Sequence, residues 1–318
     1  QEVIKQFYEA GCRNLQLDDC TWGAIVGEAA KQRYKSLGID LEEVKAQLLE
    51  VNNLALEGKP EDMREAVRAF LFEHAEEQYR DFSKSLTPGD INMLGVRLPV
   101  LRKKAKELAK GNWRKEWETE DLYFEEIMLR GMMLSYVKEP LDEILPYIED
   151  FIPRVDNWSV CDSVFSKMDI LRTDREKTWD FIRKYLYSDR EFDTRVGIII
   201  MMQHLLKCDE NGKTKKRLRT ISMEDCRHPA RTPGTYLEQI FHALNREFQP
   251  YYTSMAAAWT LAEAFCCYPK ETLDFLSGCM LDDRTYNRAL QKMVESRIPQ
   301  KDVKDYLRGL KRKPANRQ

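Results

Sequence analysis

Hydrophobic residues recur every three or four positions along most of the chain, from residue 63 to the C-terminus. That period is typical of amphipathic helices, and almost no segment shows the strict alternation of a half-buried strand. Proline, glycine or polar turns separate most neighbouring segments, which predicts many helices joined by short turns. The predicted helices cover residues 63–86, 98–110, 121–137, 141–151, 158–168, 175–187, 192–207, 235–248, 251–267, 270–276, 283–296 and 301–311.

Antiparallel helix pairs joined by short turns are the units of an α-solenoid. We therefore predict an all-α fold, an alpha-alpha superhelix (HEAT-like repeat solenoid), for a domain over residues 63–318. Residues 208–234 are polar and basic, contain two prolines and two glycines, and interrupt the helical pattern. We interpret this segment as an insert in the repeat domain.

The spacing of conspicuous residues supports a repeat. Arg195 follows Trp158 by 37 positions, and Trp259 follows Arg195 by 37 positions once the 27-residue insert is left out. This is slightly below the period of about 40 residues that is usual for HEAT-type pairs. The spacing predicts that Trp158, Asp162, Arg195 and Trp259 line a single concave face.

Residues 1–62 follow a different pattern. A helix, a short buried strand at Asn14–Asp19 and an amphipathic helix at Leu41–Leu56 are predicted, which is a short mixed α/β N-terminal fragment. The segments AGCRNLQLDDCTWG (10–23), SLGIDLEEV (36–44) and NLALEGKPEDM (53–63) resemble part of the barrel domain of the cobalamin-independent methionine synthase family. A closed barrel needs eight such units. We therefore carry over no methyl-transfer activity and interpret residues 1–62 as a barrel-like appendage, which a fusion near Met63 would explain.

The composition, with 43% hydrophobic and 33% charged residues, is typical of a soluble folded protein. No run approaches the roughly eighteen apolar residues of a membrane span, and the first residues lack a signal-peptide pattern. We therefore expect a cytoplasmic protein without membrane contact. The nearest approach to a metal motif, Cys208, Cys226 and His228, lacks an evident fourth ligand. We expect neither a metal site nor a cofactor.

Basic residues gather in three places, although the formal net charge is −2. One group lies in the insert and another at the C-terminus. Such groups can hold phosphates by counterion release, but a basic run is also common on a solvated face, and charge alone leaves both interpretations open. The third group, which we name as candidate DNA-binding residues, shares one predicted helix and comprises Arg97, Arg102, Lys103, Lys104 and Lys106.

The stretch from Val155 to Ser163 carries the most suggestive chemistry. Asn157 can cap a new helix, which places Trp158 and Asp162 one turn apart on one face. A carboxylate beside a large aromatic ring is partly desolvated, so its charge acts strongly on a cation held against the ring. The alternative is a buried tryptophan with an aspartate that binds a backbone amide or a neighbouring arginine.

Five segments in order carry a resemblance over residue 63 to the C-terminus, without the insert. They resemble the DNA alkylation repair family of HEAT-like-repeat DNA glycosylases. In that family an aspartate and two tryptophans surround the modified nucleotide, and an arginine braces the DNA backbone. By motif, the resemblance assigns these catalytic roles to Asp162, to Trp158 and Trp259, and to Arg195. The segments are GVRLPVLRKKAKELAK (95–110), DNWSVCDS (156–163), TRVGIIIMMQHLL (194–206), AAAWTLAEAFCCYP (256–269) and LDDRTYNRALQKMVESRI (281–298).

The resemblance implies a DNA glycosylase that excises positively charged alkylated purines, such as 3-methyladenine or 7-methylguanine, by hydrolysis of the N-glycosidic bond. Its partner would be double-stranded DNA with alkylated bases, and we expect a monomer. The insert departs from shorter members, and Asn157 stands where an aromatic residue would extend the stacking surface. The alternative is a non-catalytic HEAT-like module that binds nucleic acid or protein through its concave face. A base-release assay discriminates between the two.

Overall fold

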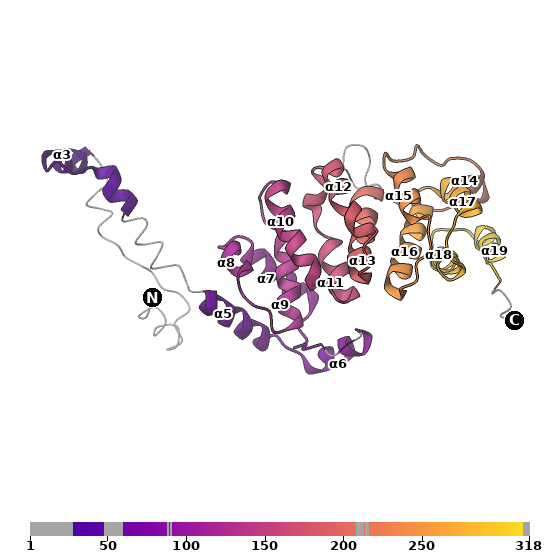
Figure 1. Cartoon of the computed structure of the whole chain (residues 1–318), viewed down its shortest axis with the longest axis horizontal. Helices are drawn as coiled ribbons and strands as arrows, with labels where there is room; N and C mark the ends of the chain where they lie inside the picture. Colours follow the sequence, from indigo (N-terminus) through magenta and orange to yellow (C-terminus); the bar gives the residue numbers. More distant parts are fainter. Residues whose placement is uncertain are drawn as a thin grey trace. The chain divides into compact units, whose positions relative to one another are not determined.

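The computed structural model describes residues 28–47, 60–87, 89, 91–207, 213 and 216–313. The chain divides into two compact units, Gln1–Ala69 and Phe70–Gln318, and each is described by itself (Figure 1). In the first unit, α3 (Glu28–Ser36) is joined to helical residues 41–47 through a turn at Gly38, whose φ of +69° favours glycine.

Two calls on the N-terminal region stay predictions. The strand expected at residues 14–19 lies outside the described residues, so the mixed α/β character of residues 1–62 is not settled. The domain boundary expected after residue 62 falls inside α5 (Pro60–Glu73), a helix that also crosses the division between the two units.

The described part of the second unit is built from helices and contains no β-strand, which confirms the all-α prediction. Its remaining elements are α6 (Glu77–Leu86), α7 (Leu98–Leu108), α8 (Trp113–Trp117), α9 (Phe124–Leu134), α10 (Leu141–Phe151), η1 (Ile152–Arg154), α11 (Trp158–Phe165), η2 (Asp169–Arg172), α12 (Arg175–Leu186), α13 (Glu191–Ile200), η3 (Met201–Leu206), α14 (Met223–Arg227), α15 (Leu237–Leu244), α16 (Tyr251–Cys267), α17 (Pro269–Gly278), α18 (Asp283–Glu295) and α19 (Lys301–Gly309).

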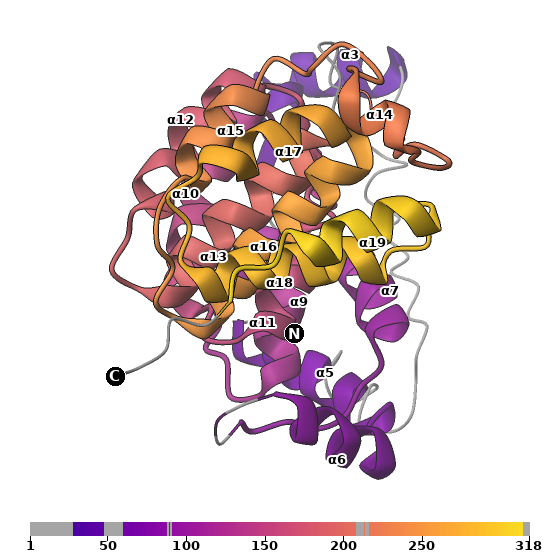
Figure 2. The same ribbon diagram turned by 90° about the vertical axis from the view of Figure 1, so that its right-hand side faces the viewer.

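The helices of the second unit form two layers. In the first layer, α7, α9, α11, α13, α16 and α18 pack one against the next. In the second, α8 and α10 pack on α9, α12 packs on α13, α17 on α16 and α19 on α18. Figures 1 and 2 show this regular succession from α7 to α19. It is the predicted solenoid, in which each helix pair buries its apolar side against its neighbours.

Side-chain caps determine where several helices begin. The Asn157 side chain accepts a hydrogen bond from the Val160 N–H at 2.9 Å, as the sequence predicted, and α11 therefore begins at Trp158. Asp174 and Asp282 cap α12 and α18 in the same way. Because α11 starts at this residue, Trp158 and Asp162 lie one turn apart on one side of a first-layer helix.

Three local features differ from the predicted helices. The helix expected over residues 63–86 is broken into α5 and α6, because Glu76 is extended and its N–H donates to the Gly95 carbonyl at 3.1 Å. The helix expected over residues 192–207 changes into a π-helix, η3, at Met201. Two short helices, α8 and α14, are additional to the predicted set.

The insert is packed onto the C-terminal helix pairs. Ile221 is fully buried, its N–H donates to the Ile298 carbonyl at 3.1 Å, and its own carbonyl accepts from the Gln300 N–H at 2.9 Å. The Leu218 N–H donates to the Cys266 carbonyl at the end of α16. The described part of the insert therefore packs into the core of the C-terminal helices.

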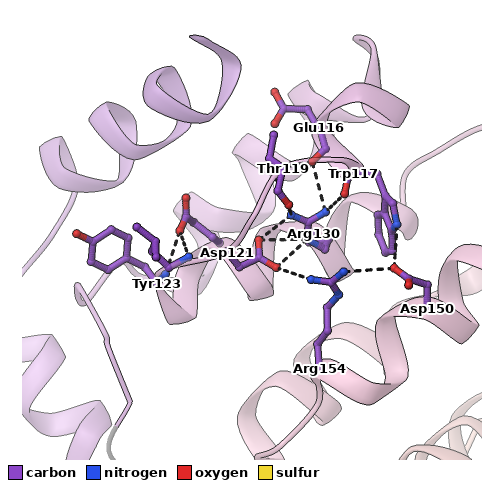
Figure 3. A network of polar contacts seen from close by, with 10 residues as sticks. Glu116, Trp117, Thr119, Asp121, Tyr123, Arg130, Asp150 and Arg154 are labelled. Atoms are coloured by element: carbon purple, nitrogen blue, oxygen red, sulfur yellow. Dashed lines mark hydrogen bonds and ion pairs between the residues drawn. The ribbon is translucent and has the colours of Figure 1, made fainter. Parts of the chain in front are cut away.

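A buried arginine joins α8 to α9, and a second arginine connects η1 to the same carboxylate (Figure 3). Arg130 of α9 pairs with Asp121 through two nitrogens and also donates to the Trp117 and Thr119 carbonyls. Arg154 then reaches the same Asp121 carboxylate at 3.5 Å. A charge this deeply buried needs complete pairing, and these contacts supply it. No helix in the described part of the chain has the length and apolar character needed to cross a membrane.

Candidate functional site

Asp162 of α11 and Arg195 of α13 form a bidentate ion pair. Arg195 Nε donates to Asp162 Oδ1 at 3.0 Å, and Nη2 donates to Oδ2 at 2.7 Å. Arg195 Nη1 donates to the carbonyl oxygen of Tyr252, the second residue of α16, at 2.7 Å. One guanidinium thus joins three successive first-layer helices, in the two-pronged geometry that arginine and carboxylate favour.

The two partners differ in their access to solvent. The Arg195 side chain is 6% exposed and the Asp162 side chain 19%. Burial alone would lower the pKa of Arg195, but the hydrogen bonds and charge of Asp162 outweigh it and the pKa is raised. Arg195 is therefore a fixed cation behind the carboxylate, and a molecule approaching from solvent meets Asp162 first.

Trp158 is half-buried and is oriented by α6. Its indole Nε1 donates to the Leu86 carbonyl, the last residue of α6, at 3.0 Å. An indole N–H that is satisfied in this way holds the ring in a defined orientation. Trp158 thus stands on the same side of α11 as Asp162 with a defined orientation.

Trp259 of α16 has its own acidic partner. Its Nε1 donates to Glu263 Oε1, one turn further along α16, at 3.1 Å. Glu263 is buried, pairs with Lys207 at 3.2 Å and accepts hydrogen bonds from Nε and Nη2 of Arg217. Burial lowers the pKa of Lys207, and the Glu263 charge only partly offsets this. Arg217 belongs to the insert, so the insert touches the network that orients Trp259.

Sequence reasoning missed Glu263 and Arg217. A signal was present, because Trp259 and Glu263 repeat the four-residue spacing of Trp158 and Asp162. In both pairs the carboxylate binds an arginine in two-pronged fashion. The first layer therefore carries two tryptophan–carboxylate–arginine groups, one on α11 and one on α16.

Two of the five basic candidates on α7 and at its N-cap are already paired. Arg97 binds Glu76 through two nitrogens, at 2.7 and 2.8 Å. Lys104 binds Glu107 at 2.8 Å. A phosphate would have to compete with these carboxylates, which makes Arg97 and Lys104 weaker candidates for DNA contact.

The other three basic candidates are differently placed. Arg102 Nη2 donates to the Ser163 carbonyl at 2.9 Å, beside Asp162 on α11. The Lys106 ammonium lies 5.1 Å from the centre of the Tyr136 ring. Within the described residues, neither Lys103 nor Lys106 has a carboxylate at ion-pair distance. Both side chains are exposed and free to meet an anion.

The structure brings the four predicted catalytic residues onto three successive helices of one layer. Asp162 and Arg195 touch, Trp158 shares a helix face with Asp162, and Trp259 lies two turns beyond the Tyr252 carbonyl that Arg195 binds. Their roles, and the concavity of the face, stay predictions. Among the described residues no group of three metal-binding side chains is placed to hold a metal ion, and Cys208 lies outside those residues.

Residues 64–228 match the family model described as DNA alkylation repair enzyme. The matched segment is more than half of the chain and holds Trp158, Asp162 and Arg195. The chain belongs to the DNA alkylation repair enzyme family. The description of the family model refers to enzymes that repair alkylated DNA. Trp259 lies beyond the matched segment, so its place at the site depends on the resemblance of residues 256–269 and on the layer geometry.

Two curated Bacillus subtilis (strain 168) proteins are also similar to a short part of this chain. "Uncharacterized protein YxjH" is 36% identical over 63 residues, which is 20% of this chain and 17% of YxjH. "Uncharacterized protein YxjG" is 30% identical over 63 residues, with the same shares. The chain spans about 17% of the length of these relatives, and they assign no activity to it. The resemblance of residues 1–62 to the methionine synthase barrel stays a prediction.

Proposed function

We propose that the chain is a DNA glycosylase that removes positively charged alkylated purines, such as 3-methyladenine or 7-methylguanine, from double-stranded DNA. One observation carries the proposal: Asp162, the solvent-accessible member of its ion pair, stands one helical turn from the oriented indole of Trp158. A ring face and a carboxylate side by side form a site for a cation.

Hydrolysis of the N-glycosidic bond of a cationic purine requires mainly electrostatic stabilisation from the protein. The C1′–N bond of a cationic purine breaks with its electron pair going to the ring, which leaves as a neutral base, while positive charge develops on the sugar. Water then bonds to C1′ and releases its proton, with Asp162 as the acceptor that passes it to solvent. Asp162 stabilises the sugar cation, and because Arg195 already holds both oxygens the carboxylate needs no reorganisation.

The two tryptophans would hold the cationic nucleotide. Each ring face contributes roughly 0.5 to 2 kcal/mol toward a desolvated cation. Trp158 is tied to α6 and Trp259 to Glu263, so both rings are oriented before the substrate arrives. Arg195 acts in this proposal as the positioning residue for Asp162, and its contact with the DNA backbone stays a separate prediction.

One observation favours the second candidate function. Both Asp162 oxygens already accept hydrogen bonds from Arg195, so the pair has a sufficient structural reason, which is to join α11 to α13. In that case the chain is a non-catalytic HEAT-like module that binds nucleic acid or protein through its concave face.

A base-release assay separates the two candidates. We would measure single-turnover release of 7-methylguanine and 3-methyladenine from methylated duplex DNA by the full chain and by Asp162→Asn. The proposal expects Asp162→Asn to slow release by roughly two to three orders of magnitude, with affinity for undamaged duplex nearly unchanged. The matched control is Asp180→Asn, which changes an exposed carboxylate on α12. This variant should release base at the original rate.

Melting curves of the same proteins complete the test. If the original chain releases neither base, the non-catalytic module is the better description. The catalytic proposal also fails if Asp162→Asn is merely destabilised and its folded fraction releases base as fast as the original protein.

A further inference from the structure

A pocket of about 740 Å³ opens where α7 and α9 end. Its wall comes from the last turn of α7, the start of α8 and the turn that follows α9. The lining includes four cationic residues and one acidic residue, which gives the pocket an excess of positive charge. These are Lys106, Lys110, Arg114 and Lys138, with Glu139 as the acid.

Three of these cations lack an anionic partner. Glu139 is taken by Arg114, at 3.1 Å. In the described part of the chain, no carboxylate lies within ion-pair distance of Lys106, Lys110 or Lys138. Three unpaired ammonium groups around one pocket repel one another, and an anion in the pocket would relieve that repulsion.

Aromatic rings hold two of the cations in place. The Lys106 ammonium lies 5.1 Å from the centre of the Tyr136 ring, and the Arg114 guanidinium lies 4.4 Å from that of Trp113. Trp113 is itself buried and packs edge-on against Tyr147 at 4.7 Å. Cations that rest on ring faces lose less freedom when they bind an anion, so part of the site is organised in advance.

Helix α7 links the candidate site to the pocket, because Arg102 contacts α11 and Lys106 lines the pocket. Arg102 contacts the Ser163 carbonyl, next to Asp162, and Lys106 follows Arg102 by one helical turn, about 6 Å. Lys110 follows just beyond the end of the helix. A DNA strand advances by roughly 3.4 Å per nucleotide along its axis, so a strand at Asp162 reaches this row of cations within a few nucleotides.

We propose that this pocket, the α7-end pocket, binds phosphate, and that it holds backbone phosphates of the DNA strand whose damaged nucleotide lies at Asp162. The DNA source of the phosphate rests on the proposed function. The pocket itself does not, because it would hold the phosphate of a free molecule by the same contacts.

Helix electrostatics give a simpler reason for two of the lysines. A cation near the carboxyl end of a helix interacts favourably with the helix dipole, which accounts for Lys106 and Lys110 on α7 without any ligand. Lys138 lies in the turn between α9 and α10, where the favourable dipole of α9 and the unfavourable dipole of α10 oppose each other, and the dipole does not require a cavity. If the dipole were the whole reason, removal of the lysines would change stability and leave anion binding unchanged.

The test compares two triple variants of the full chain that lose the same charge. Binding of undamaged duplex DNA would be measured by fluorescence anisotropy at several salt concentrations. One phosphate contact contributes about 0.9 to the slope of log affinity against log salt concentration. The variants are Lys106→Ala/Lys110→Ala/Lys138→Ala and, as a control on α18 and α19, Lys292→Ala/Lys301→Ala/Lys304→Ala.

The pocket variant should lower the magnitude of the salt slope by about 2 to 3 and weaken binding at low salt by at least about tenfold. The control should change neither. A pocket variant that behaves like the control overturns the proposal. Failure of the proposed function is distinct, because it shows as absent base release by the original chain at saturating DNA.

A second arm identifies the source of the phosphate. Inorganic tripolyphosphate is titrated into both variants and the original chain by calorimetry. If the original chain binds tripolyphosphate but no duplex, and the pocket variant binds neither, the pocket is supported as a site for a free phosphate-bearing molecule. If the original chain binds neither probe, the phosphate site is overturned.

Discussion

Asp162 and Arg195 form an asymmetric pair, because the cation is far more deeply buried than the carboxylate. A buried charge that loses its partner is costly, whereas a charge near the surface can recover water. The free energy of unfolding should therefore respond differently to removal of each partner.

We expect Asp162→Ala to lower the free energy of unfolding by roughly 3 kcal/mol, because it leaves the Arg195 guanidinium buried and uncompensated. Arg195→Met keeps most of the side-chain volume and leaves only the more exposed carboxylate, so it should lower the free energy of unfolding by about 1 to 2 kcal/mol. Urea unfolding of both variants measures the difference. Equal losses would show that packing and not charge dominates this contact.

His204 gives the protein an acid-sensitive group close to α11. It is fully buried in η3, its Nε2 lies 2.6 Å from the Phe165 carbonyl, and its Nδ1 lies 3.2 Å from Arg172 Nε, which is a donor. The ring therefore donates through Nε2 and accepts through Nδ1, as a neutral imidazole does. Burial is the main cause that lowers the pKa of His204 to about 4.

Because the pKa of His204 is lower in the folded protein than the 6.5 of an exposed histidine, protons favour the unfolded state. The contribution of His204 to the free energy of unfolding should be fully present above pH 6.5. It should fall by roughly 3 kcal/mol in all as the pH drops from 6.5 toward 4. Urea midpoints measured across this range test it. His204→Asn should reduce this loss of stability at low pH. His228→Asn, which changes an exposed histidine in the insert, should leave the loss unchanged.

The segment that leads into α7 is held by one glycine and one buried acid. Glu125 of α9 accepts the N–H groups of Leu94, Gly95 and Val96, at 3.0, 2.7 and 3.2 Å. Gly95 has φ of +95°, and a Cβ there would lie 2.5 Å from the Glu76 carbonyl oxygen. The same segment therefore separates α5 from α6 and sets the start of α7.

Gly95→Ala should lower the free energy of unfolding by at least about 2 kcal/mol, because the new methyl group meets backbone atoms that have no room to move and φ is unfavourable. Gly111→Ala is the matched control. Its Cβ would lie 3.5 Å from the Leu108 carbonyl oxygen, an ordinary contact, so its effect should stay within about 1 kcal/mol. Thermal melts of both variants decide, and similar losses would contradict the steric account.

The elements that the sequence predicted best are those with local causes. The bounds of α10 and α16 agree with the prediction, and α11 begins where Asn157 caps it. The break between α5 and α6 was missed because its cause, the Gly95 carbonyl, lies far along the chain from Glu76. Arg195 binds Asp162, a partner 33 residues away that no local pattern identifies, and its expected contact with DNA stays a prediction.

The 37-residue spacing of Trp158, Arg195 and Trp259 predicted that these residues share one helix layer. It did not predict the side chains that they contact there. Trp158 and Trp259 occupy first-layer helices as the 37-residue period requires, yet the network of Glu263 with Arg217 and Lys207 depends on the path of the insert. The insert was expected to interrupt the solenoid. Its buried Ile221 and the Arg217 contact show that its described part is fixed to α16 and to the C-terminal helices.

The stack in the second unit stabilises itself through contacts between neighbouring helix pairs, so a change at one end should affect only the first pair. The candidate site on α11, α13 and α16 and the α7-end pocket both belong to this unit. The base release proposed for the site and the phosphate binding proposed for the pocket should therefore survive removal of residues 1–62, provided that α5 remains long enough to fold.

A chain shortened to begin at Met63 keeps all but the first turn of α5 and should retain its helicity and its melting temperature within about 2 °C. A chain beginning at Phe70 keeps only the last turn of α5, in which Leu71 is fully buried, and should melt at a clearly lower temperature. Circular dichroism melts of the two shortened chains and the full chain, with duplex binding as a second readout, measure this. If the chain beginning at Met63 unfolds or aggregates, residues 1–62 contribute to the core and the predicted boundary is wrong.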